Sequence, residues 1–385
     1  MITANTTLLN FARKVEDFRT GNRVFYPSAS IVFMAFVGVL CGAKEWEDVV
    51  EIGESCADLL KELLEDDFVG VPSHDTFNRF FNLISTASME KAFRETMSTV
   101  YAQSASPSHK EVVAVDGKYL KGVKGNSALN MVSAYATELG ICLGQEEADK
   151  KINEPEAFRR LLGGLELKNY IVTADALHCE KESAKAIVQA KGDYILIVKG
   201  NQLHLQEAIK EAVRVESIRG KKRFIDRAEE ISQGHGRTER RICYSCSHKG
   251  WLPNLGRDWE NLQSFGCITC ERTDHATGQT STETRCFIST LKMDAAAHMR
   301  WIRSEWKIEN NLHWQLDVTF KEDACRMTKA QSKNLSLLRK LAMPVLKDFK
   351  YKKNASMRKK MLAAALKPDI KRKLILSALA FYANS

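Results

Sequence analysis

Two short stretches, VVAVDGK at residues 112–118 and IVTADALH at residues 171–178, decide how the chain is expected to fold. Each begins as a run of apolar residues that predicts a buried strand, and each run ends at an aspartate, Asp116 or Asp175. Side chains at the carboxyl ends of strands in α/β folds face the crevice in which ligands bind. We therefore expect both carboxylates at one edge of a sheet, with a simple turn cap as the alternative role for either one.

The segments around these stretches predict the order β-β-β-α-β-α-β. Strands are expected at 111–115, 129–137, 141–145, 170–174 and 194–198, and helices at 154–165 and 180–190. This order opens a ribonuclease-H-like fold, a mixed sheet with helices on both faces, but other α/β folds share it. In a ribonuclease-H-like sheet the first and fourth strands are neighbours, so Asp116 and Asp175 would converge.

The chain divides into three regions. Residues 1–105 predict an all-helical domain, and the polar stretch SASPS at 104–108 predicts a linker after it. Residues 106–345 predict the α/β domain, with a β-rich insertion at about 206–293 before its last helix. Residues 346–385 predict a basic helical tail.

Composition excludes several classes of protein. The chain has 385 residues, of which 44% are hydrophobic, with only 7 Pro and 21 Gly, so it is neither disordered nor fibrous. The longest apolar run, at 31–43, is too short to span a bilayer, and the first residues lack the features of a signal peptide. Because the ten cysteines stand in a large chain without an export signal, we expect a reduced cytoplasmic setting and no membrane partner.

The net charge of +9 is concentrated at one end. Residues 346–385 hold eleven Lys and Arg against two Asp, whereas residues 1–100 hold nine Lys and Arg against fifteen Asp and Glu. A basic tail on a neutral body suits a polyanionic partner, because each cation near a phosphate releases counterions. A solvated helix face is the alternative.

A third carboxylate is expected from the stretch WKIENNLHW at 306–314, where Glu309 shares a predicted helical face with His313. Asp317, Glu322 and Asp323 compete for this place. Three carboxylates at one site repel one another unless cations lie between them. Oxygen ligands suit Mg²⁺ or Mn²⁺, and two such ions can drive phosphodiester chemistry.

Further blocks run in order from about residue 20 to 345. They are YPSASIV, GAKEWEDV, GVPSHDTFNRFF, VAVDGKYLKG, TADALHCEKE, DYILIVKGNQ, GHGRTERR, FISTL and WxIENNLHWxLDVTFKEDACR. These blocks resemble the DDE-type insertion-sequence transposases called H-repeat-associated proteins. The resemblance covers nearly the whole chain, and several blocks are specific to that family. One departure is Glu305, because the family often has a His at this position.

The resemblance implies a ribonuclease-H-like catalytic domain in which Asp116, Asp175 and Glu309 bind two Mg²⁺ or Mn²⁺ ions. It implies an enzyme that cleaves the ends of an insertion element and joins the 3′-hydroxyls to double-stranded target DNA. Such a protein is expected in the bacterial nucleoid, as a homo-oligomer when bound to DNA. A ribonuclease-H-like nuclease that cuts without joining and a catalytically silent DNA-binding descendant are the alternatives.

Several polar side chains are candidates for contact with DNA because they follow the predicted catalytic strands or lie on the insertion. They are Lys118, Lys121, Lys199, Asn201, Arg237, Arg240 and His313. Such contacts would go mainly to the backbone and would carry little sequence information. Surface solvation is the alternative for the lysines, and packing is the alternative for His313.

Four cysteines have the spacing of a zinc ribbon, namely Cys243, Cys246, Cys267 and Cys270. The two residues between the members of each pair would place their sulfurs on opposite faces of a strand. We therefore expect structural cysteines, with zinc as the alternative.

Overall fold

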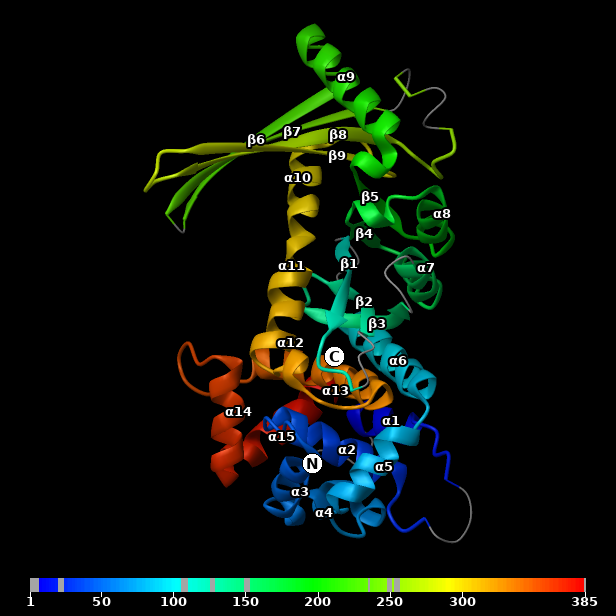
Figure 1. Cartoon of the computed structure of the whole chain (residues 1–385), viewed down its shortest axis with the longest axis vertical. Helices are drawn as coiled ribbons and strands as arrows, with labels where there is room; N and C mark the ends of the chain where they lie inside the picture. Colours follow the sequence, from blue (N-terminus) through cyan, green and yellow to red (C-terminus); the bar gives the residue numbers. More distant parts are fainter. Residues whose placement is uncertain are drawn as a thin grey trace.

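The computed structural model describes residues 7–19, 24–104, 110–124, 129–148, 153–234, 236–247, 251–252 and 257–383. Its elements form three tiers along the long axis (Figure 1). A helical tier contains both ends of the chain, a middle tier holds strands β1–β5, and the third tier holds strands β6–β9 with helix α9. The predicted linker at 104–108 lies almost wholly outside the described residues.

The helical tier confirms the all-helical reading of the first region. Its helices are α1 (Thr7–Lys14), α2 (Ser28–Leu40), α3 (Trp46–Glu54), α4 (Ala57–Leu64), α5 (His74–Leu83) and α6 (Thr86–Ser104). Helix α2 is apolar on all sides and is buried from Ala29 to Leu40, so the other helices can pack around it. Ser73 caps the start of helix α5, because its side chain accepts a hydrogen bond from the amide of Thr76.

All the strands among the described residues form a single nine-stranded sheet in the order β3-β2-β1-β4-β5-β9-β8-β7-β6. Strand β1 pairs with β4, and β4 with β5, in parallel, and the other neighbours are antiparallel. The bounds are β1 (Glu111–Leu120), β2 (Leu129–Ala136), β3 (Ile141–Ala148), β4 (Tyr170–Ala174), β5 (Asp193–Val198), β6 (Ile225–Gly234), β7 (Arg237–Ser247), β8 (Ser264–Asp274) and β9 (Thr280–Ser289). The expected adjacency of the first and fourth strands is confirmed.

Strand β1 is longer than predicted. We expected it to end at Val115, but it continues to Leu120 because its second half stays paired with β2. Its parallel pairing with β4 ends at the pair Val115 and Ala174. Asp116 and Asp175 therefore each follow the last residue of the pairing between β1 and β4.

The insertion extends the central sheet instead of forming a sheet of its own, because β9 pairs with β5. It begins with helix α9 (Leu203–Arg219) and ends before α10 (Ala295–Ser304). Helices α10, α11 (Trp306–Ile308) and α12 (Trp314–Val318) follow one another along one side of the central strands (Figure 1). Helices α7 (Glu154–Gly163) and α8 (Lys181–Gln189) lie on the other side.

The basic tail is folded into the helical tier and is not a free arm. After helix α13 (Lys329–Asp348), helices α14 (Met357–Leu366) and α15 (Pro368–Ala383) pack beside it, and α15 contacts α1. The ammonium group of Lys360 donates to the backbone oxygen of Leu346 at 2.7 Å, and Arg372 pairs with Glu62 at 3.0 Å. Part of the positive charge of the tail therefore faces its own chain.

The cysteines of the insertion alternate as their spacing predicted. Cys243 packs in one apolar cluster with Ile268 and Phe287, whereas Cys246 packs in the main core cluster with Cys267. The two sulfurs of the first pair therefore face opposite sides of the sheet, which is not the arrangement of a zinc ribbon. No described helix is both long and apolar enough to cross a bilayer.

A buried histidine joins α10 to the insertion strands. The Nδ1 atom of His298 lies 3.2 Å from the hydroxyl of Ser245. The centre of its ring lies 4.9 Å from the centre of the Phe287 ring, and the two rings are tilted relative to each other. Burial lowers the pKa of His298 to about 4. The folded protein therefore keeps this ring neutral at a pH where the unfolded chain protonates it.

We predict that His298 makes the fold less stable in mild acid. The unfolded state binds the extra proton between pH 6.5 and about 4, so the free energy of unfolding falls by up to about 3 kcal/mol over that range. Urea unfolding at several pH values measures this loss. His298→Gln should show a weaker pH dependence than His204→Gln, a change at an exposed histidine, and equal pH dependence would contradict the prediction.

Candidate active site

Asp116 and Asp175 lie side by side at the point where β1 and β4 separate. The Oδ1 atom of Asp116 accepts a hydrogen bond from the amide of Gly117 at 2.9 Å. The Oδ1 atom of Asp175 accepts one from the amide of Leu177 at 3.0 Å and so caps a short 3₁₀ helix, Ala176–His178. The turn-cap role that we weighed for a strand-end aspartate is thus present at Asp175, where it occupies Oδ1.

The environment of Asp116 disfavours its negative charge. Burial raises the pKa of Asp116 to about 7, the Gly117 amide opposes this rise, and the carboxylates of Asp175 and Glu154 add to it. Asp116 is therefore a partly buried carboxyl group with two other carboxylates beside it. A cation bound nearby would stabilise its charged form.

The helical segment after the insertion runs from α10 to the end of α12, residues 295–318, and we call it the late helix. It presents Glu305, Glu309 and His313 at intervals of four residues, which places them along one face. The Nδ1 atom of His313 is 3.6 Å from the Oδ2 atom of Asp116. Burial raises the pKa of Glu305 to about 7, and Asp175 and Asp116 add to this rise. Glu309 is exposed, one turn from each of the other two.

The structure thus adds a carboxyl group that the sequence analysis did not include among the site residues. Glu305 interacts electrostatically with both aspartates, and its Oε2 atom is buried with no hydrogen-bond partner among the described residues. Its four-residue spacing from Glu309 was the signal for it. The backbone at Glu309–His313 forms a π-helical turn, a feature frequent at functional sites.

The side chains here suit a hard divalent cation. Apart from the imidazole of His313, they offer carboxylate oxygens, which Mg²⁺ and Mn²⁺ prefer, and the unpaired oxygen of Glu305 is available to a ligand. Within the described part of the chain, no group of three or more His, Cys, Asp and Glu side chains has the arrangement of a complete metal site. Asp116, Asp175 and a glutamate of the late helix are the residues that would hold such an ion.

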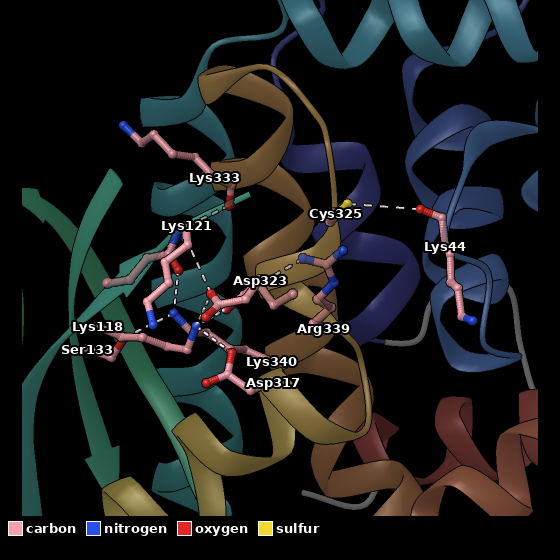
Figure 2. A network of polar contacts seen from close by, with 12 residues as sticks. Lys44, Lys118, Lys121, Ser133, Asp317, Asp323, Cys325, Lys333, Arg339 and Lys340 are labelled. Atoms are coloured by element: carbon pink, nitrogen blue, oxygen red, sulfur yellow. Dashed lines mark hydrogen bonds and ion pairs between the residues drawn. The ribbon is translucent and has the colours of Figure 1, made fainter. Parts of the chain in front are cut away.

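Lys118, which we expected to be an exposed contact for DNA, is buried and paired with carboxylates. Its side chain is 8% exposed, and its ammonium group lies 2.7 Å from Asp317, 3.1 Å from Asp323 and 3.4 Å from Glu322 (Figure 2). Burial lowers the pKa of Lys118, but these carboxylates outweigh burial and raise it above the ordinary value. The three acids that competed with Glu309 are therefore partners of Lys118.

This ion cluster joins the two elements that carry the candidate site. Lys118 is two residues from Asp116 on β1, and Asp317 is four residues from His313 on the late helix. Glu322 also pairs with Arg339 of α13 at 3.4 Å. The cluster thus fixes the position of the late helix against β1.

The other expected DNA contacts have different surroundings. Lys121 and Lys199 are exposed, and Lys199 is close enough to Glu305 to oppose the rise in its pKa. The side-chain amide of Asn201 donates to the backbone oxygen of Ala176 at 2.6 Å and so supports the turn after Asp175.

The two arginines of the insertion that we expected to contact DNA, Arg237 and Arg240, are paired with carboxylates. Arg237 lies 2.8 Å from Glu239, and Arg240 lies 2.7 Å from Glu229 and 3.0 Å from Glu271. His235, in the same GHGRTERR stretch, lies outside the described residues.

Glu154 is a second residue that the sequence analysis missed. It is buried, accepts a hydrogen bond from Asn130 at 2.8 Å and lies 3.4 Å from the Nε2 atom of His178. A Cβ atom at Gly117 would lie 2.6 Å from its Oε1 atom, so this approach requires glycine at 117. Glu154 thus contacts β1, β2 and the turn after Asp175.

Comparison with known proteins places this site in a family. The sequence model described as "Transposase DDE domain" matches residues 107–373, and the one described as "DDE_Tnp_1-associated" matches residues 9–97. The chain belongs to the DDE transposase family. The larger match includes every candidate site residue and continues into the basic tail.

Relatives within the DDE transposase family align along almost the full length. The H repeat-associated putative transposase YhhI of Escherichia coli K12 is 32% identical, over 91% of this chain and 93% of the relative. Putative transposase YncI of E. coli O157:H7 is 32% identical, over 93% and 92%. A solved piggyBac transposase synaptic complex with hairpin DNA covers 98% of this chain and 78% of its own, with a TM-score of 0.38 at 12% identity, and we base no argument on it.

We predict that Lys118 is essential for stability. Lys118→Met leaves Asp317 and Asp323 without their shared cation and removes one of the two cations beside Glu322, and breaking the buried pair of Lys118 and Glu322 costs about 3 kcal/mol or more. Lys121→Met, a change at an exposed lysine three residues away, should alter stability by less than about 0.5 kcal/mol. Urea unfolding at pH 7 measures both changes, and similar midpoints for the two variants would show that the cluster does not stabilise the fold.

Proposed function

We propose that this transposase cleaves the ends of an insertion element and joins the freed 3′-hydroxyls to target DNA. The observation that carries the proposal is the juxtaposition of Asp116 and Asp175 on adjacent parallel strands of a transposase-family chain, with the face of the late helix beside them. The strand order β3-β2-β1-β4-β5 supports a ribonuclease-H-like catalytic domain, interrupted by the insertion.

We assign metal binding to Asp116, Asp175 and Glu309. Two divalent cations bound there would activate the attacking oxygen and neutralise the leaving oxygen. The aspartates have rigid backbone positions because both belong to paired strands or their immediate ends. Glu309 lies between Glu305 and His313, both of which interact with the aspartates, so its exposed side chain can turn to the same site.

Of the side chains that we expected to contact DNA, we propose the two exposed lysines Lys121 and Lys199 and the groove-lining arginine Arg237. Lys121 and Lys199 are exposed near the site. Arg237 lines a groove of about 650 Å³ that also reaches Trp306, Lys307 and Asn310 on the late helix. Because one copy of the site can hold one scissile phosphate, joining two element ends requires at least two copies of the chain.

A nuclease that cuts without joining is the second candidate, and the same carboxylates support it. A pre-cut element end incubated with target DNA and Mg²⁺ separates the two, because only a transposase forms the joined product. A DNA-binding protein without activity is the third candidate, and Mg²⁺-dependent nicking of element ends excludes it.

We predict that cleavage of element-end duplexes needs Mg²⁺ and each assigned carboxylate. Asp116→Asn, Asp175→Asn and Glu309→Gln should each lower the cleavage rate by at least about 100-fold, because each removes a group that stabilises transition-state charge. Glu305→Gln should lower it by less than about tenfold. A gel assay with labelled duplex measures all four, with Lys185→Gln as an exposed control.

Each result has a distinct meaning. If Asp116→Asn cuts at the wild-type rate, the proposed site is wrong. If Glu305→Gln is inactive and Glu309→Gln is active, the third ligand is Glu305.

A further inference from the structure

A second concavity, of about 530 Å³, lies between the helical tier and the segment 320–327. It brings together the GAKEWEDV block, the start of α5 and the end of the LDVTFKEDACR block, none of which the catalytic site uses. Figure 2 shows Arg339 and Cys325 between the Lys118 cluster and Lys44 of the helical tier. We call this concavity the helical-tier pocket.

The helical-tier pocket is rich in cations without partners. Lys44, Lys124, Lys321 and Arg326 line it, all four are exposed, and none forms an ion pair with a carboxylate of the described residues. The acidic lining residues are Glu45 and Glu47. Four free cations against two carboxylates leave this pocket positively charged, although the surrounding helical domain is acidic.

A buried donor also lines the pocket. Trp46 is 6% exposed, and its indole Nε1 atom is buried with no hydrogen-bond acceptor among the described residues. An indole nitrogen can only donate, and a buried donor without an acceptor costs free energy. Trp46 is thus a pocket-lining residue whose donor has no acceptor among the described residues.

The pocket lies within reach of DNA held at the candidate active site. His313 and Lys321 are eight residues apart, and the first five steps are helical at about 1.5 Å each. With the remaining three steps fully extended, the two Cα atoms are separated by at most about 20 Å. This is shorter than one turn of B-DNA, about 34 Å.

We infer that the helical-tier pocket binds a backbone phosphate of the same duplex that the catalytic site engages. The inference rests on the proposed function and gives the helical domain a role in holding DNA. Lysine and arginine side chains with a nearby N–H donor suit a phosphodiester, and they contact it without regard to base sequence.

The test measures DNA affinity against salt concentration, without cleavage. Fluorescence anisotropy of a labelled element-end duplex is recorded in EDTA for the full chain and for Lys321→Asn/Arg326→Gln. Asn suits position 321 because Lys321 has a left-handed backbone with φ of 56°. The matched control is Lys61→Asn/Lys185→Gln, which removes two exposed cations elsewhere.

We expect the slope of log affinity against log salt to become shallower by about 1 in the pocket variant, because losing the contact with one phosphate removes about 0.9. The control and Arg326→Lys should keep the wild-type slope. Circular dichroism and urea unfolding check that all variants fold alike.

The outcomes separate this inference from the proposed function. If wild-type protein binds and cuts DNA but the pocket variant keeps the wild-type slope, the inference fails and the proposed function stands. Calorimetry with inorganic phosphate at constant ionic strength tests the other source of the same chemistry, and phosphate binding lost in a variant with an unchanged DNA slope would assign the pocket to free phosphate. If wild-type protein binds no duplex, both proposals fail.

Discussion

A single buried ammonium group, that of Lys118, faces three carboxylates that come from the end of the late helix and the turn after it. The charges of Lys118 and Glu322 are removed from water, which is costly unless opposite charges remain beside them. Asp116 is two residues from this lysine, and His313 is four residues from Asp317. The ion cluster therefore sets the separation between the strand and the helix that supply the candidate active site.

The candidate active site at Asp116 and Asp175 differs from the Lys118 cluster in its charge balance, because carboxylates lie beside one another there. There Asp116 and Glu305 are half-buried with other carboxylates beside them, and the pKa of each is raised to about 7. The cations of the Lys118 cluster are already neutralised by their own partners. The uncompensated negative charge at Asp116 and Asp175 is therefore the feature that suits this site to a divalent cation.

The fold supports this arrangement from both ends. Strand β9 of the insertion pairs with β5, so the insertion and the catalytic strands share one sheet, and α10 leads from it directly into the late helix. At the other end, α13 connects the cluster to the helical tier through Arg339. The helical domain thus contributes to the geometry of the site and, through its own pocket, to the DNA path that we infer.

Much of the fold and part of the candidate site could be predicted from the sequence. The apolar runs that lead to Asp116 and Asp175 were recognisable as strands because a run of apolar residues followed by an acid is a local pattern. The adjacency of those strands followed from their order, and the opposite faces of Cys243 and Cys246 followed from strand alternation. These features depend on residues close together in the chain.

Only the tertiary structure decided which charges meet. Lys118 and Asp323 are 205 residues apart, so no local pattern shows that this lysine is buried and paired instead of exposed to DNA. The approach of Glu305 to both aspartates and the packing of the basic tail on the acidic helices depend on contacts of the same kind. Local sequence determines where strands, helices and acidic ends lie, whereas burial and charge pairing are set by residues that the folded chain brings together from distant positions.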